Sequence, residues 1–266
     1  MSDDLASVIR ELTARAEAEP LPLIALTDEE IAALGAGPAD LGPVPLPWLA
    51  TKDEAERQLA CQVALRGLAA RQLVVPFGPD GGRESVALHD DLRSVLAMRH
   101  SARAVICALR ESDQRMRLVY LGVTGALEEA ISPGGLHGFT VLAHTAVAGR
   151  LAAFADPEEA AADVLPNGRE APPRILPLAE IAGGAQLPVT GARSVTMVER
   201  LVFGDADDEQ REQRLTVYAR KADVVVASPV EADGEQALRF TEVTRAGLRD
   251  CVNGLLPALS AREDAS

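Results

Sequence analysis

The feature that most constrains the fold is an order of strands and a helix that occurs twice. In residues 101–156, apolar and β-branched segments separated by turn residues predict an antiparallel meander, and a helix closes the unit near Phe154. The same order returns in residues 192–259, where the closing helix is expected at about 241–259. The expected strands are 103–110, 116–124 and 126–131 in the first copy and 193–203, 214–219 and 224–228 in the second.

The two copies also align by residue type. The matched positions are Ala102-Arg103 with Ala192-Arg193, Arg117-Leu118 with Arg214-Leu215, Tyr120 with Tyr218, and Phe139 with Phe240. The second copy differs mainly at 204–210, where acidic residues lengthen the first turn. Two such units, each with one apolar sheet face, bury most apolar surface by pairing about a pseudo-twofold axis.

Helices and a hairpin are expected before the first copy. Residues 3–18 place Leu5, Val8, Ile9, Leu12 and Ala16 on one helical face that ends before Pro20. Thr27 and Glu30 have the spacing of a capping box for a short second helix that Gly35 ends. A proline- and glycine-rich arm follows and carries Trp48, the only tryptophan.

Residues 52–99 predict a helix, a hairpin and a second helix. Thr51 and Glu54 repeat the capping spacing, and Leu59, Val63 and Leu68 are expected to form the buried stripe of a helix at 52–72. The expected hairpin strands 73–77 and 84–88 flank Pro79-Asp80-Gly81-Gly82, and Asp90 or Asp91 opens the next helix. This order resembles a winged-helix unit.

The sequence therefore predicts an α+β fold: a quasi-twofold repeat of a β-meander plus helix, preceded by a winged-helix-like segment. Within one domain of 266 residues we expect subdomains at 1–156 and 192–259, a proline-rich connector at 157–191 and a disordered tail at 260–266. The prolines of the connector should leave room only for brief helical turns.

Composition and charge exclude several classes of partner. Twenty-six basic and forty acidic residues give a net charge of -14, and a field of that sign repels nucleic acid and anionic lipid. The acidic start and the lack of a long apolar run argue against a secretory signal or a membrane span. Cys61, Cys107 and Cys251 are odd in number and far apart, which is typical of reduced cysteines in a cytosolic protein.

No motif predicts a cofactor site. The glycine-containing stretch from Gly184 to Ser194 lacks the spacing and the lysine of a phosphate loop. The run from Gly134 to Gly138 does not have the dinucleotide fingerprint, and a turn explains it better.

Candidate catalytic and metal-binding groups are equally isolated. His89, His100, His137 and His144 have unhelpful spacings, and the last two are expected to be surface or helix-cap histidines rather than metal ligands. Adjacent carboxylates point apart on a strand or helix, which applies to Asp90-Asp91, Glu128-Glu129 and Asp207-Asp208. Cys107 lies in an apolar strand without a cationic neighbour and is expected to be inert. We therefore predict no enzyme and no catalytic, cofactor or metal residues.

Several short motifs carry a resemblance to a known family. They are Leu26-Thr27-x-x-Glu30, the proline-rich arm, Glu54-Ala55-Glu56-Arg57, the run from Ala64 to Leu73, and Asp91-Leu92-Arg93-x-Val95-Leu96, followed by the repeat. In this order the chain resembles the EspG family of type VII (ESX) secretion chaperones over nearly its whole length.

The resemblance implies a single EspG-like domain that acts in the cytoplasm without cofactors. It also implies that the protein holds the exposed hydrophobic tip of a helical secretion substrate, which in mycobacteria is a heterodimer of PE and PPE proteins. An apolar sheet face and the segment Ile175-Leu176-Pro177-Leu178 could cover such a tip. The contact residues and the oligomeric state stay unassigned.

A transcriptional regulator or ligand sensor is the alternative from another class. It would use residues 52–99 as a winged helix, and the local basic residues are Arg66, Arg71, Arg83, Arg93 and Arg99. These arginines are equally compatible with solvated helix edges. An enzyme of unrecognised type and an unassigned interaction protein also stay open.

Overall fold

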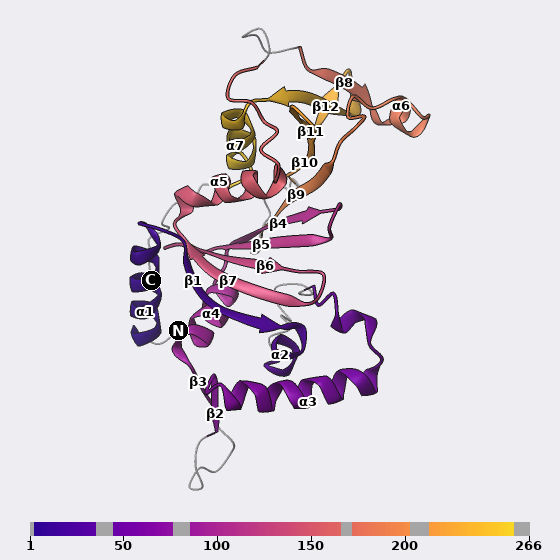
Figure 1. Cartoon of the computed structure of the whole chain (residues 1–266). Helices are drawn as coiled ribbons and strands as arrows, with labels where there is room; N and C mark the ends of the chain where they lie inside the picture. Colours follow the sequence, from indigo (N-terminus) through magenta and orange to yellow (C-terminus); the bar gives the residue numbers. More distant parts are fainter. Residues whose placement is uncertain (1–2, 36–44, 77–85, 166–171, 203–212, 258–266) are drawn as a thin grey trace. The chain divides into compact units, whose positions relative to one another are not determined.

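The computed structural model describes residues 3–35, 45–76, 86–165, 172–202 and 213–257 (Figure 1). They fall into two compact units, one of residues 1–103 and 119–144 and the other of residues 104–118 and 145–266. The turn at Pro79-Asp80-Gly81-Gly82, the acidic turn with Asp207-Asp208 and the tail 260–266 lie outside the described residues. The division into 1–156, 157–191 and 192–259 stays a prediction.

The strands of the first unit are ordered β1-β7-β6-β5, and residues 115–118 at the start of β5 belong to the second unit (Figure 1). Their bounds are β1 Leu21–Thr27, β5 Arg115–Leu121, β6 Ala126–Ile131 and β7 Leu136–Leu142. β1 and β7 pair antiparallel and were not predicted. No strand was predicted at residues 21–27, where Pro22 is tolerated because β1 is an edge strand, and the glycines around β7 were interpreted only as a turn.

Helix α1 (Asp3–Ala16) buries the predicted apolar face through Ile9, Leu12 and Ala16. Helix α2 (Asp28–Ala33) begins at the predicted capping box, in which Thr27 and Glu30 each accept the other's backbone N–H. The helix-hairpin-helix order of 52–99 is also confirmed. It consists of α3 (Glu54–Ala70), β2 (Val74–Pro76), β3 (Val86–Leu88) and α4 (Asp90–His100), and the short helical turn η1 (Leu49–Thr51) precedes it.

Two details of α3 differ from the prediction. Its N-cap is Asp53, which forms a capping box with Glu56, rather than Thr51. The expected buried stripe is wrong, because Leu59 and Val63 are 63% and 57% exposed. Leu68 is buried, but it does not share a helical face with the other two, and α3 packs only its Leu68 side against α2.

The strands of the second unit are ordered β4-β9-β10-β11-β12-β8. Their bounds are β4 Ala104–Arg110, β8 Arg174–Pro177, β9 Ser194–Val202, β10 Gln213–Ala219, β11 Val224–Ala232 and β12 Glu235–Val243. The helices that follow β7, β8 and β12 are α5 (His144–Ala155), α6 (Leu178–Ala182) and α7 (Arg245–Asn253). No helix in the described ranges is long and apolar enough to span a membrane.

Two predictions for this unit are wrong. The connector holds a strand, β8, because prolines at 172, 173 and 177 favour extended backbone and β8 needs pairing only on its β12 side. The closing helix does not begin at 241, because residues 241–243 belong to β12. Its start is fixed by the N-cap Thr244, whose hydroxyl accepts the N–H of Gly247.

The repeat is confirmed by backbone register. The N–H of Arg103 donates to Leu121 O, and the N–H of Arg193 donates to Ala219 O. Tyr120 and Tyr218 each precede the acceptor residue, so they are equivalent, as predicted. The pairing of Leu118 with Leu215 is off by one, because this register aligns Leu118 with Thr216.

Residues that are equivalent in the two copies meet where β4 pairs with β9. Aligning Arg103 with Arg193 makes Ala108 equivalent to Val198, and these two residues are directly opposite each other and fully buried. A residue faces its own equivalent only on a twofold axis, so the β4–β9 pair carries the local pseudo-twofold axis.

The repeat is larger than the sequence indicated, because β1 and α2 of the first copy are equivalent to β8 and α6 of the second. Leu26 lies opposite His137, and Leu176 lies opposite Leu238. The two copies differ in the length of chain between this helix and the next strand of the sheet. In the first copy, residues 34–103 separate α2 from β4, whereas in the second only residues 183–193 separate α6 from β9.

Candidate functional site

A chain of buried polar side chains lies in the first unit. His137 on β7 has Nε2 2.7 Å from Asp28 Oδ1 and Nδ1 2.6 Å from Glu129 Oε1, and all three side chains are inaccessible to solvent. Ionised carboxylates only accept hydrogen bonds, so both ring nitrogens must donate unless one carboxyl keeps the proton. A neutral imidazole carries only one N–H, so a second proton must be present, either on the ring or on one of the two carboxyl groups.

Tyr120 and Arg99 complete this cluster. The Tyr120 hydroxyl donates to Glu129 Oε2 at 2.7 Å, and Arg99 Nε lies 3.7 Å from the same oxygen. Burial and the neighbouring Glu129 carboxylate raise the pKa of Tyr120 above its ordinary value. With the shared proton counted, the positive charge of Arg99 balances the remaining negative charge of the cluster.

The same cluster fixes the tryptophan arm to α2. Asp28 Oδ2 accepts the backbone N–H groups of Trp48 and Leu49 at 2.7 and 2.8 Å. Gly135, with φ of +74°, passes so close that a Cβ there would lie 2.8 Å from both Asp28 Cγ and Trp48 Cβ. The cluster is closed to substrate, so it acts as a structural clamp.

Of the four histidines, only His137 belongs to the clamp. The prediction that His137 is a surface or cap histidine is wrong, because its partners lie far away in sequence and bury it. His144 begins α5, with Nε2 3.1 Å from Gly122 O. His89 is the N-cap of α4, and His100 is its last, exposed residue.

The other chemical candidates lie apart from one another. Burial, with a smaller effect from Glu199, raises the pKa of Cys107 to about 11, as expected for an inert thiol. The three cysteines are free thiols, and each is partly buried. The stretch from Gly184 to Ser194 forms the link from α6 to β9, and Asp90-Asp91 opens α4.

The winged-helix arginines do not form a basic surface in the described part of the segment. Arg71 and Arg93 each lie within ion-pair distance of an acidic neighbour, and Arg99 is buried in the clamp. Arg66 is exposed, and Arg83 lies outside the described residues. These positions do not favour the DNA-binding alternative.

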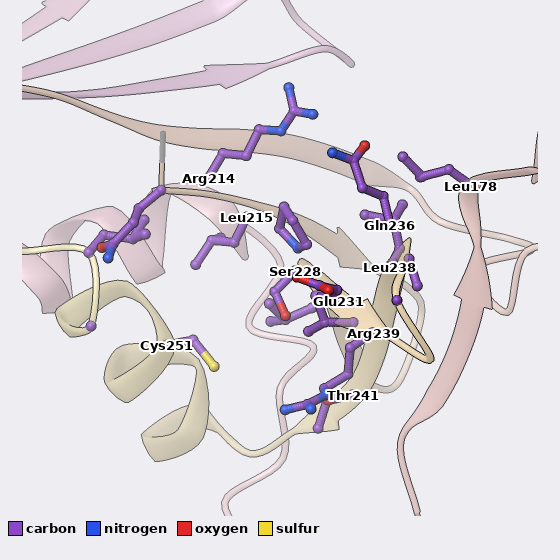
Figure 2. A pocket seen from close by; sticks show the side chains of 18 residues that line it. Leu178, Arg214, Leu215, Ser228, Glu231, Gln236, Leu238, Arg239, Thr241 and Cys251 are labelled. Carbon is purple, nitrogen blue, oxygen red and sulfur yellow. The ribbon is translucent and has the colours of Figure 1, made fainter. Parts of the chain in front are cut away.

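An open groove lies in the second unit, with a volume of about 1140 Å³. It extends over β10, β11 and β12 to the C-terminal half of α7. Figure 2 shows Cys251 pointing from α7 into this space, across from the strands that carry Leu215 and Ser228. Leu178 reaches it from the start of α6.

Strand register explains one wall of the groove. The pair Ile131 and His137 in the first copy is equivalent to Pro229 and Leu238 in the second. Beyond that point the second hairpin continues, with Val230–Ala232 paired to Glu235–Ala237. This extension brings Val230, Glu231 and Gln236 to the groove.

The side chains that line the groove are suited to binding an apolar partner rather than to catalysis. Its large apolar side chains are Leu178, Leu215, Val226, Val230, Leu238 and Leu255, and its charged side chains are Arg214, Arg239 and Glu231. The described lining residues include one carboxylate and no histidine. They therefore offer no pair of groups for general acid-base catalysis.

The predicted apolar segment 175–178 contributes to the groove in part. Leu178 lines it and is 39% exposed, whereas Leu176 is buried in a cluster with Ala227 and Phe240. Ile175 is exposed but is not among the lining residues. No sequence pattern indicated the extended β11–β12 hairpin.

Equivalent positions have opposite chemistry in the two copies. By the register of β1-α2 and β8-α6, Leu178 occupies the position of Asp28, and Leu238 occupies that of His137. The buried ionic clamp of the first copy is thus replaced by apolar side chains at an open groove.

The chain shares its fold with a type VII secretion chaperone. A solved structure of Mycobacterium tuberculosis EspG5 in complex with a PE25-PPE41 dimer matches with a TM-score of 0.56. The match covers 88% of this chain and 97% of the EspG5 chain at 9% sequence identity. No family model and no curated protein matches the sequence. The expected α+β architecture and the resemblance to EspG are confirmed at the level of fold.

Proposed function

We propose that this protein is a chaperone that binds the exposed apolar tip of a helical type VII secretion substrate in the cytoplasm and keeps it soluble. The observation that carries the proposal is the open apolar groove over β10, β11, β12 and α7. EspG5, whose fold the chain shares, is described in complex with a PE25-PPE41 dimer.

Physical chemistry favours this use of the groove. Exposed apolar side chains of the size of Leu178 cost free energy in water, and a partner that covers them recovers about 25 cal/mol per Å² of apolar area. The net charge of -14 favours the solubility of a chain that exposes such a groove. The work requires no bond-making group, so the proposal includes no enzymatic activity.

The experiment is affinity capture of the tagged chain from its native host, with the partner identified by mass spectrometry. We expect a helical pair that a type VII system exports. Leu178→Asp should abolish capture, because it places a charge in the apolar groove. Leu59→Asp is the matched control, since Leu59 is exposed on α3 and is not among the residues that line the groove, so the variant should capture normally.

Capture of nucleic acid, or of partners that Leu178→Asp retains, would contradict the proposal.

A further inference from the structure

The first copy of the repeat shows what covers the surface that α6 exposes in the second. In the first copy, η1 and α3 cover α2. The N–H of Leu49 in η1 donates to Asp28, and α3 packs against α2. These elements come from residues 34–103, the segment inserted between α2 and β4. Asp28 and Ile31 of α2 are consequently buried.

Among the described residues the second copy has no helix over α6 comparable to α3, and only Leu187 and Val189 of the link pack beside Ile181 on the buried cluster. Only residues 183–193 separate α6 from β9, which is too short for another helix of the length of α3. Leu178, equivalent to Asp28, is exposed, and Ile181, equivalent to Ile31, is only partly buried. The apolar surface of α6 and the groove therefore form a position that the described residues fill in the first copy and leave open in the second.

We infer that the partner completes the second copy by placing a short helical turn and the helix that follows it over Leu178 and Leu238, where η1 and α3 lie in the first copy. This inference rests on the proposed function and adds the conformation and position of the bound segment. It comes from the internal repeat rather than from the likeness to EspG5.

The chemistry of the two positions defines the contact. Asp28 accepts backbone N–H groups, so it can hold the exposed start of η1. Leu178 and Leu238 offer no acceptor side chain, so the partner must present apolar side chains to them rather than unpaired N–H groups. Apolar residues at i and i+3 or i+4 of a helix supply such a face.

An extended partner segment fits less well. It would have to add to the free edge of β8, the last strand of the second unit. β8 spans only Arg174–Pro177, and Pro177 has no N–H to donate. A helix needs no backbone pairing with the sheet, so this edge does not limit it.

Two fluorescein-labelled synthetic peptides test the inference by fluorescence anisotropy. The first is a lactam-stapled helix with leucines at i, i+3 and i+7. The second peptide has the same leucines but carries a central proline and no staple, so it cannot form the helix. We expect the stapled peptide to bind the wild-type chain at least about tenfold more tightly than the proline peptide. Leu178→Asp should remove that binding, whereas Leu59→Asp should leave it unchanged.

Equal binding of the two peptides, binding of neither, or an equal loss in Leu178→Asp and Leu59→Asp would overturn the inference. Capture from the native host decides the proposed function separately, because it does not depend on the conformation of the bound segment. A chain that captures a type VII substrate but binds both peptides alike would thus retain the function and lose the inference.

Discussion

Nε2 of His137 lies 2.7 Å from Oδ1 of Asp28, although the two residues are 109 positions apart in the chain. The contact joins the start of α2 to β7, and through Asp28 it also holds the backbone of Trp48. Both side chains are fully buried, so the contact between them offsets the free-energy cost of removing each from water. The clamp is therefore a tertiary tie that keeps the first copy of the repeat closed.

Replacing His137 with glutamine should strongly destabilise the protein. The change removes the imidazole that lies between the buried carboxyl groups of Asp28 and Glu129, and breaking a buried pair costs about 3–5 kcal/mol. The free energy of unfolding from urea denaturation is the measurement. Arg193→Gln is the control, because it breaks an exposed ion pair with Glu158 and should cost less than about 1 kcal/mol. Equal losses in the two variants would contradict the role of the clamp.

Tyr120 predicts the behaviour at high pH. Its pKa is raised in the folded state, so its contribution to stability is present below the unfolded value of about 10 and is lost as pH rises above it. Tyr120→Phe should cost about 1–3 kcal/mol at neutral pH, because Glu129 loses a donor. Above pH 10 the variant's stability should fall less steeply than that of the wild type.

Tyr218→Phe is the matched control for this titration, because Tyr218 is equivalent in the repeat but only partly buried. It should change the pH dependence less. Parallel urea-denaturation curves for Tyr120→Phe and the wild type above pH 10 would refute the argument.

Gly135 and Gly138 provide a matched pair in one strand region. A Cβ at Gly135 would lie 2.8 Å from Asp28 Cγ, at a positive φ, whereas a Cβ at Gly138 would meet nothing within 4 Å. Gly135→Ala should therefore destabilise the protein by about 1–3 kcal/mol and Gly138→Ala should have little effect. Thermal unfolding of the two variants compares them directly. The explanation fails if Gly138→Ala is the more harmful change.

The sequence predicted the repeat because local periodicity marks strands and helices, and Tyr120 and Tyr218 do have the same register. It did not predict β1 or β8, because their prolines suggest breaks and only the edge position makes them tolerable. The residues at the start of the expected last helix form the end of β12, since pairing with β11 outweighs local propensity there.

The sites were harder to predict than the fold. Nothing near His137 in sequence indicates Asp28, so only the tertiary structure shows that it is a clamp residue. The groove was missed because its walls come from an extended hairpin and from the start of α6. The alignment of Asp28 with Leu178 could have shown the contrast between the copies, but it depends on strands β1 and β8.

Cysteine reactivity should rank by burial and pKa. Burial raises the pKa of Cys107 to about 11, so about a thousandth of it is thiolate at pH 8. Iodoacetamide should modify Cys61 first, because it is the least desolvated of the three, and Cys107 last. Peptide mass spectrometry over time measures the order. Rapid labelling of Cys107 in the folded protein would contradict it.

The most direct test of the account is the maleimide labelling of Cys251 in the free chain and in the complex captured from the native host. Cys251 lines the groove, whereas Cys61 on α3 does not. If the groove holds the partner, labelling of Cys251 should slow at least about tenfold in the complex while labelling of Cys61 keeps its rate. An intact complex in which Cys251 reacts as fast as in the free chain would show that the partner binds elsewhere.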